Sequence, residues 1–202
     1  MTTVTRERPA RYPFRMAEST DREAITLLRR RDPRGFDLAY AAYAAKIRGF
    51  LVRLGRDAAL ADDLVQHTFL RLAEQGPELR AGSDLRAWLF AVARNAYTSH
   101  ARRLRPESDD GALEALASPP PDVEARLLLG DVESALGRLR ADDREVLLLV
   151  GAEGLDHAAV ATMLGVQPAA LRQRLARARS RLLVELERAR HAPGDAAREA
   201  LP

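Results

Sequence analysis

Hydrophobic residues recur at intervals of three and four along most of this chain, and the spacing predicts two groups of helices. In the first group the helices are expected over residues 20–30, 33–54, 57–75 and 84–104. In the second group, apolar runs predict two short helices, over about 143–150 and 157–164, and a longer helix that begins at Pro168. The pattern predicts an all-α protein.

Capping residues mark where several of these helices begin. Thr20 and Glu23 have the spacing of a capping box, and Ser83 is placed to cap the helix that follows it. Asp32 and Pro33 are typical of a helix start, because proline lacks the N–H that would be unpaired there. We expect the helix from Pro33 to end at Gly55.

The second group has the order of a helix-turn-helix. Asp142 is placed to cap the helix that carries the apolar run, which ends at Gly151 and Gly154, and Asp156 is placed to cap the next. Gly165 then supplies the positive φ that a sharp turn requires. Because the last helix follows this turn, it is the candidate recognition helix.

The helix from Pro168 has an apolar side and a basic side. Leucines and Ala178 fall on one stripe, with arginines along both flanks. Near its beginning, Ala169, Ala170 and Gln173 offer small or amide side chains that can enter a major groove. Five arginines within ten residues can also be only a solvated face, but the capped helix and glycine turn before them favour DNA binding.

Residues 105–121 are rich in proline, glycine and acidic side chains, which indicates a linker and not a packed element. The expected organisation is two small helical domains joined by this flexible linker. The parts are a flexible extension (1–19), a first domain (20–104), the linker (105–121), a second domain (122–190) and a tail (191–202).

Composition excludes several kinds of site. The chain has no cysteine, and its four histidines lack the spacing of metal ligands, so no metal or cofactor is expected. No catalytic constellation is recognisable, which argues against an enzyme. The first 19 residues lack the apolar core of a signal peptide or a membrane span, and a cytoplasmic protein without direct membrane insertion is expected. The net charge of +3 hides local clusters of arginines and of acids.

Two helices of the first domain carry unusual polar faces. On the helix over 57–75, Leu70 is an apolar residue among acids and amides; it is either a scattered surface residue or an anchor for a partner. The helix over 84–104 interleaves Phe90 and Tyr97 with arginines, as single-stranded nucleic-acid sites do. For these two aromatics, packing against the helix over 33–54 is the favoured interpretation, and Trp88 is also expected in the core.

Three segments together carry a family resemblance. They are Asp62-Asp63-Leu64-Val65-Gln66-His67-Thr68-Phe69-Leu70-Arg71-Leu72, then Leu85-Arg86-Ala87-Trp88-Leu89-Phe90-Ala91-Val92-Ala93-Arg94-Asn95, then the helix-turn-helix. In order and spacing, about residues 20–190 resemble a bacterial RNA polymerase sigma factor of the extracytoplasmic-function (ECF) group. The resemblance implies that the first domain binds polymerase and the minus-ten promoter element, and that the second binds the minus-35 element.

The resemblance also implies site residues and partners. Those expected to bind the clamp coiled coil of the largest polymerase subunit are Asp62, Asp63, Gln66, Phe69 and Leu70. Those expected at the opened minus-ten strand, with the loop from Gly76 to Asp84, are Arg86, Arg94, Asn95, Tyr97, Arg102 and Arg103. Those expected at the minus-35 duplex are Ala169, Ala170, Arg172, Gln173, Arg174 and Arg177. The implied partners are core RNA polymerase, including its flap, promoter DNA and an anti-sigma factor.

The recognition helix departs from the family pattern, because Ala170 and Gln173 stand where threonine and serine are common. DNA binding is still expected, with an altered preferred sequence. His67, where the family commonly has glutamate, similarly alters the charge of the polymerase surface. The alternative to a sigma factor is a helix-turn-helix regulator that does not bind core polymerase, and affinity for the core enzyme separates the two.

Overall fold

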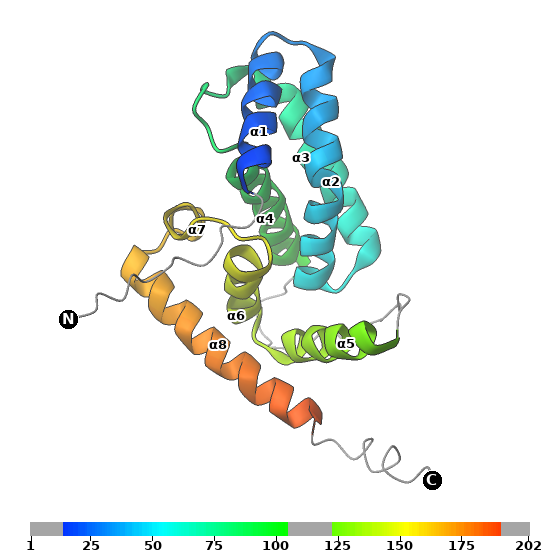
Figure 1. Ribbon diagram of the computed structural model, residues 1–202, viewed down its shortest axis with the longest axis vertical. Coiled ribbons are helices and arrows are strands. Elements are labelled where there is room, and N and C mark those ends of the chain that lie inside the picture. Colours follow the sequence, from blue (N-terminus) through cyan, green and yellow to red (C-terminus); the bar gives the residue numbers. More distant parts are fainter. Residues whose placement is uncertain (1–13, 105–122, 191–202) are drawn as a thin grey trace, which may run out of the picture.

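The computed structural model describes residues 14–104 and 123–190, and every regular element in these ranges is helical (Figure 1). The first range contains α1 (Phe14–Arg29), α2 (Pro33–Gly55), α3 (Ala58–Gln75), the short 3₁₀ turn η1 (Gly76–Glu78) and α4 (Leu85–Leu104). The second contains α5 (Val123–Arg138), α6 (Ala141–Val146), the π-helical turn η2 (Leu147–Ala152), α7 (His157–Leu164) and α8 (Pro168–Arg190). The all-α prediction is confirmed. The predicted linker (105–121), the tail (191–202) and residues 1–13 of the predicted extension lie outside the described residues.

Helices α1 to α4 form a bundle, in which α2 packs against each of the other three. Figure 1 shows these helices side by side, with α2 and α3 forming one edge. Their apolar stripes meet in a core whose fully buried members include Ile25, Ile47, Phe50, Leu72 and Phe90. Phe50 and Phe90 meet edge to face, with ring centroids 5.4 Å apart. Phe90 is therefore a core residue, as the packing interpretation predicted.

Helices α5 to α8 form the second half, with α8 packed against α5, α6 and α7. The apolar run of α6 and η2 is buried, and it faces Leu171, Leu175 and Ala178 on the apolar stripe of α8. In Figure 1, α8 runs diagonally below α6 and α7, while α5 lies at its far end. Sequence reasoning did not identify α5 as a separate helix.

The two halves share one continuous apolar cluster. Buried side chains of α2 and α4 and those of α6, η2 and α8 belong to the same set of packed residues. The closest approach brings α2 against α5, α6 and η2, and α4 against α7. The second half is therefore docked on the bundle in this structure.

Several predicted helix ends are confirmed. The carboxylate of Asp32 accepts a hydrogen bond from the N–H of Arg34 at the start of α2, where Pro33 is the first helical residue. Asp156 caps α7 in the same way, accepting from the N–H of Ala158 at 2.8 Å. Gly165 follows α7 with φ +65°, a conformation that costs glycine nothing. The turn before the recognition helix is thus built as the sequence predicted.

Three predicted starts were wrong. Thr20 lies inside α1, which already begins at Phe14. Asp84, and not Ser83, caps α4, by accepting from the N–H of Ala87 at 2.8 Å. The predicted end of α2 at Gly55 is confirmed, and the left-handed residue after it is Arg56, with φ +59°.

Asp142 was the third error. It lies within the first turn of α6, and the residue at the N-cap position is Arg140, which makes no side-chain capping bond. The carboxylate of Asp142 instead forms an ion pair with Arg174 of α8, with N and O 2.9 Å apart. Because α6 already begins at Ala141, the carboxylate of Asp142 does not stand at the N-cap position, and it pairs across to α8 instead.

Candidate nucleic-acid interface

Helix α8 presents the face that the sequence predicted. Its leucine stripe is buried against α6 and α7, while Ala169, Ala170, Arg172 and Gln173 are exposed. Arg177, one turn further on, is also exposed. Small side chains and an amide at the beginning of a helix, framed by arginines, form a surface that fits the major groove of duplex DNA.

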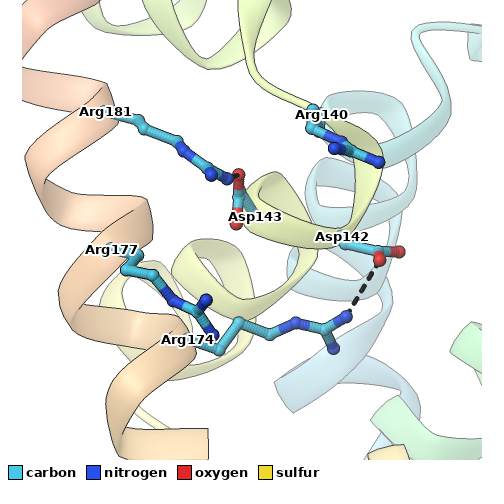
Figure 2. Close-up of a pocket in the computed structure, with 6 residues that line it drawn as sticks. All are labelled: Arg140, Asp142, Asp143, Arg174, Arg177 and Arg181. Carbon is cyan, nitrogen blue, oxygen red and sulfur yellow. Dashed lines mark hydrogen bonds and ion pairs between the residues drawn. The ribbon is translucent and has the colours of Figure 1, made fainter.

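Four arginines line a hollow between α6 and α8. Figure 2 shows Arg174, Arg177 and Arg181 reaching from α8 toward Arg140, Asp142 and Asp143 at the beginning of α6. Asp143 is buried, with 5% of its surface exposed, and pairs with Arg181. Together with the Asp142–Arg174 pair, this contact fixes the recognition helix to α6.

The candidate minus-ten residues on α4 divide into two sets. Asn95, Arg102 and Arg103 are exposed, and they remain available to a nucleic acid. Arg94 instead pairs with the buried Glu145 of α6, with Nε and Oε1 2.8 Å apart. Tyr97 is partly buried, and its ring lies against Gly55, where an added Cβ would approach Cε2 to 2.7 Å. The packing interpretation of Tyr97 therefore holds for this structure.

Arg86 is partly buried near the loop from Gly76 to Asp84. That loop and the turn before α7 line a cavity between the two halves. The lining includes Ala81, Gly82 and Ser83 from the first half and Gly154 and Leu155 from the second. The loop that was expected to hold an opened strand therefore faces the second half here.

Arg144 makes a polar contact between the halves that sequence reasoning missed. Its guanidinium donates to the carbonyl oxygens of Leu136, Gly137 and Leu139 around the turn from α5 to α6. It also donates to the carbonyl of Leu54 at the end of α2, at 3.0 Å. Burial, and then the nearby positive charge of Arg56, lowers the pKa of Arg144. This side chain satisfies backbone carbonyls in both halves at once.

A second buried carboxylate strengthens the same contact. Glu153, 5% exposed, follows η2 and accepts a hydrogen bond from Arg53 of α2 at 2.9 Å. Burial raises the pKa of Glu153, and Arg53 opposes that shift. Acidic residues next to an apolar run were the one sequence signal for this interface, since an acid on a buried helix requires a cation.

Helix α3 carries the surface expected to bind polymerase. Asp62, Asp63, Gln66 and Leu70 are exposed, and 63% of Leu70 is accessible. Phe69 does not belong to this surface, because only 3% of it is accessible. Its ring instead packs against Tyr40, with centroids 4.8 Å apart. Phe69 can therefore support the docking face only from beneath.

Arg48 of α2 pairs with Asp62, and this pairing is the first cause of the lowered pKa of that carboxyl. Asp62 is therefore an anion at neutral pH, which keeps the α3 face acidic. In residues 14–104 and 123–190, no cluster of three potential metal ligands occurs, and no helix is long and apolar enough to cross a membrane.

Comparison with known families matches both halves separately. Residues 39–107 match the family model of sigma-70 region 2, and residues 129–182 match that of sigma-70 region 4. The two matches together span more than half of the chain.

Individual proteins agree with the family models. An ECF RNA polymerase sigma factor, EcfG of Rhodopseudomonas palustris, is 36% identical over 143 residues, which cover 70% of this chain and 79% of the relative. The ECF sigma factor SigC of Mycobacterium tuberculosis is 35% identical over 178 residues, which cover 85% of this chain and 96% of the relative.

Two solved structures share the fold. The sigma factor RpoE of Bartonella quintana, in complex with the anti-sigma factor NepR, is 31% identical with a TM-score of 0.66, covering 75% of this chain and 96% of that one. CnrH in complex with the cytosolic domain of CnrY is 26% identical with a TM-score of 0.64, and the match covers 83% of this chain and 97% of that one.

Proposed function

We propose a division of labour for this chain, which belongs to the ECF group of the sigma-70 family of RNA polymerase sigma factors. In this proposal, residues 20–104 bind core polymerase and the minus-ten element, and residues 122–190 bind the minus-35 element. The observation that carries it is the pair of exposed faces on α3 and α8, one acidic with a central leucine and one basic with small side chains.

The α3 face binds the clamp coiled coil of the polymerase. Leu70 supplies the apolar anchor, and Asp62, Asp63 and Gln66 supply polar contacts around it. An exposed leucine surrounded by polar residues is the arrangement expected of an interface centre with a polar rim. The second half adds a contact to the flap.

The α8 face reads the minus-35 duplex. Ala169 and Ala170 allow close approach to the groove floor, and Gln173 can form a bidentate pair with adenine. Arg172, Arg174 and Arg177 contact phosphates or guanine from the flanks. In this arrangement Gln173 is the main source of the altered sequence preference.

The α4 face and the loop from Gly76 to Asp84 hold the opened non-template strand. Melting costs about 1.4 kcal/mol per base step on average, and captured bases and phosphate contacts offset it without any nucleotide hydrolysis. Arg94 can take part only after the second half leaves α4, because Glu145 of α6 occupies it in this structure. Tyr97 lies against Gly55 at the end of α2, within the first half, so its release requires a local rearrangement of that contact. Binding to polymerase supplies the energy for that separation.

Transcription in vitro tests this function directly. Purified chain is added to core polymerase on a library of promoter fragments, and start sites are sequenced. We expect initiation at a subset of promoters that share an upstream and a downstream element. A chain that binds the library fragments but never directs initiation would be the helix-turn-helix regulator, and the sigma-factor proposal would fail.

Leu70→Asp tests the docking surface. A charge at the centre of an apolar contact is expected to weaken binding to core polymerase by more than about a hundredfold, as the loss of an interface hot spot does. Val132→Asp on α5 is the control, because it places the same charge at another exposed apolar site. Circular dichroism checks that both variants are folded. Equal binding by both variants would remove α3 from the interface.

An anti-sigma factor is proposed as a further partner. The sigma factor from Bartonella quintana was solved with the anti-sigma factor NepR bound. We also propose that the protein acts in the cytoplasm, where polymerase is found, and that it has no catalytic activity of its own. Co-purification from cells that express the chain with an affinity tag tests the partner.

A further inference from the structure

The hollow between α6 and α8 lies beside the recognition helix and has a lining of its own. It encloses about 220 Å³, and its lining consists of Arg140, Asp142, Asp143, Arg174, Arg177 and Arg181 (Figure 2). Four guanidinium groups against two carboxylates leave it positively charged. Such an excess favours an anion.

The two carboxylates account for two of the four arginines. Asp142 holds Arg174, and the buried Asp143 holds Arg181. Within residues 14–104 and 123–190, Arg140 and Arg177 have neither an ion pair nor a hydrogen bond through their side chains, and both are exposed. Arg140 and Arg177 are therefore the cations whose donors remain for a ligand.

The position of the hollow limits what that ligand can be. A helix with its side chains is about 10–12 Å wide, and the major groove is about 12 Å wide. When the face with Ala169, Ala170 and Gln173 lies in the groove, the flank with Arg177 therefore lies against one sugar-phosphate strand. Arg140 stands across the hollow from that flank (Figure 2).

We propose that the hollow between α6 and α8 binds one backbone phosphate of the minus-35 duplex, with Arg140 and Arg177 as its direct ligands. This inference rests on the proposed binding of duplex DNA by α8. It adds Arg140, which lies outside the recognition helix, to the DNA-binding residues. Guanidinium groups suit the task, since they donate two parallel hydrogen bonds to phosphate oxygens.

A methylphosphonate scan tests the contact. The probe is a short duplex that carries the upstream element recovered in the transcription experiment, with one phosphate at a time made neutral. Binding of the full chain is measured by fluorescence anisotropy. For the unmodified chain, we expect one neutral position to weaken binding about threefold to tenfold. That position should lose its effect in Arg140→Ala and in Arg177→Ala, because their ligand is already missing.

The salt dependence gives a second readout. Loss of one phosphate contact should reduce the magnitude of the slope of log K against log salt by about 0.9. Arg140→Lys should restore most of the slope, while Arg30→Ala, an exposed arginine in the bundle, should leave it unchanged. The proposal is overturned if Arg140→Ala and Arg177→Ala both leave the salt slope unchanged and if each methylphosphonate weakens binding equally in the variants and the parent.

A titration with inorganic phosphate distinguishes a site for a duplex phosphate from a site for a free anion. Followed by ³¹P NMR on the full chain, inorganic phosphate should bind only in the millimolar range. Micromolar binding that the duplex does not compete with would show a site for free phosphate and contradict the proposal. Arg172→Ala and Gln173→Ala report on duplex recognition itself. If they weaken binding while Arg140→Ala does not, only the phosphate site fails; if none of them matters, the proposed function of α8 fails.

Discussion

Two helices, α4 and α8, each carry several arginines but have different surroundings. On α8 the arginines near the beginning of the helix face solvent, and the acids that pair with its flank come from the same half of the molecule. On α4, Arg94 pairs with Glu145 of the other half, and Tyr97 packs at the end of α2. The beginning of α8 is therefore exposed to solvent, whereas α4 is partly covered.

The difference shows that residue type alone does not make a nucleic-acid surface. Glu145 occupies Arg94 as a phosphate would, and it sits in a site with little water, where the pair is hard to exchange. Arg102 and Arg103, only two turns further along α4, stay exposed. The coverage therefore depends on which residues the second half reaches, and it can be changed by mutation.

The largest effect is expected at the contact that holds the halves together. Arg144→Met keeps an unbranched apolar stem but removes every donor, so four carbonyls lose this partner, including that of Leu54. We expect the free energy of unfolding to fall by about 2–4 kcal/mol. Urea denaturation of the full chain measures it. A loss below about 0.5 kcal/mol would mean that the Arg144 hydrogen bonds are not stabilising.

Two arginine variants then separate the roles of the helices. Arg172→Ala should weaken duplex binding by about 1–3 kcal/mol and leave stability unchanged, because its side chain faces solvent. Arg94→Ala should destabilise the fold by about 1–3 kcal/mol and leave duplex binding unchanged, because Glu145 loses its partner in a buried site. The opposite result for either variant would contradict the contrast between α8 and α4.

Glu145→Gln tests whether the covering carboxylate competes with a nucleic acid. The amide can still accept from Arg94 but carries no charge, so the pair is weakened by about 1 kcal/mol. We therefore expect single-stranded minus-ten DNA to bind the free chain about fivefold more tightly. The gain should vanish in the polymerase complex, where the halves are expected to be apart. Glu185→Gln, which alters an acid paired with Arg188 of α8 and Arg138 of α5, both in the second half, is the control. A gain of equal size in both variants would point to net charge alone.

The smallest effect concerns pH. Burial raises the pKa of Glu153 above its usual value, so the folded state holds this proton more tightly than the unfolded chain. The contribution of Glu153 to stability is then greatest below its unfolded pKa, and it declines as pH rises through the raised value. Glu153→Gln cannot titrate, so its stability relative to the parent should increase over that window. Unfolding curves between about pH 4 and 8 measure this difference, and a difference that falls with pH would contradict the raised pKa.

The helices and the turn before α8 could be predicted because their causes are local. Asp32, Asp156, Gly165 and Pro168 act on backbone groups within a few residues, so their positions in the sequence suffice. Two errors were local, since Asp84 caps α4 in place of its neighbour Ser83 and Thr20 lies inside a longer helix, and a third has a distant partner. Asp142 has the sequence of a cap, but Arg174 lies 32 residues away and is invisible to a local rule.

The candidate surfaces were predictable to the extent that they follow from helical periodicity. Leu70 is exposed and Leu171 is buried, as the stripes on α3 and α8 require. Phe69 shows the limit, because its place in the motif suggested a contact and its burial excludes a direct one. Arg140 was not predicted at all, since nothing in its neighbourhood in the sequence indicates that it faces α8.

The sequence by itself determined the helices, the division into two groups and the faces that each helix presents, because spacing and capping act over one or two turns. Only the tertiary structure decided which of those faces meet. Buried pairs such as Arg94 with Glu145 join residues 51 positions apart, and their energy depends on the exclusion of water by both halves together. For that reason one arginine helix of this sigma factor is open and the other is partly covered.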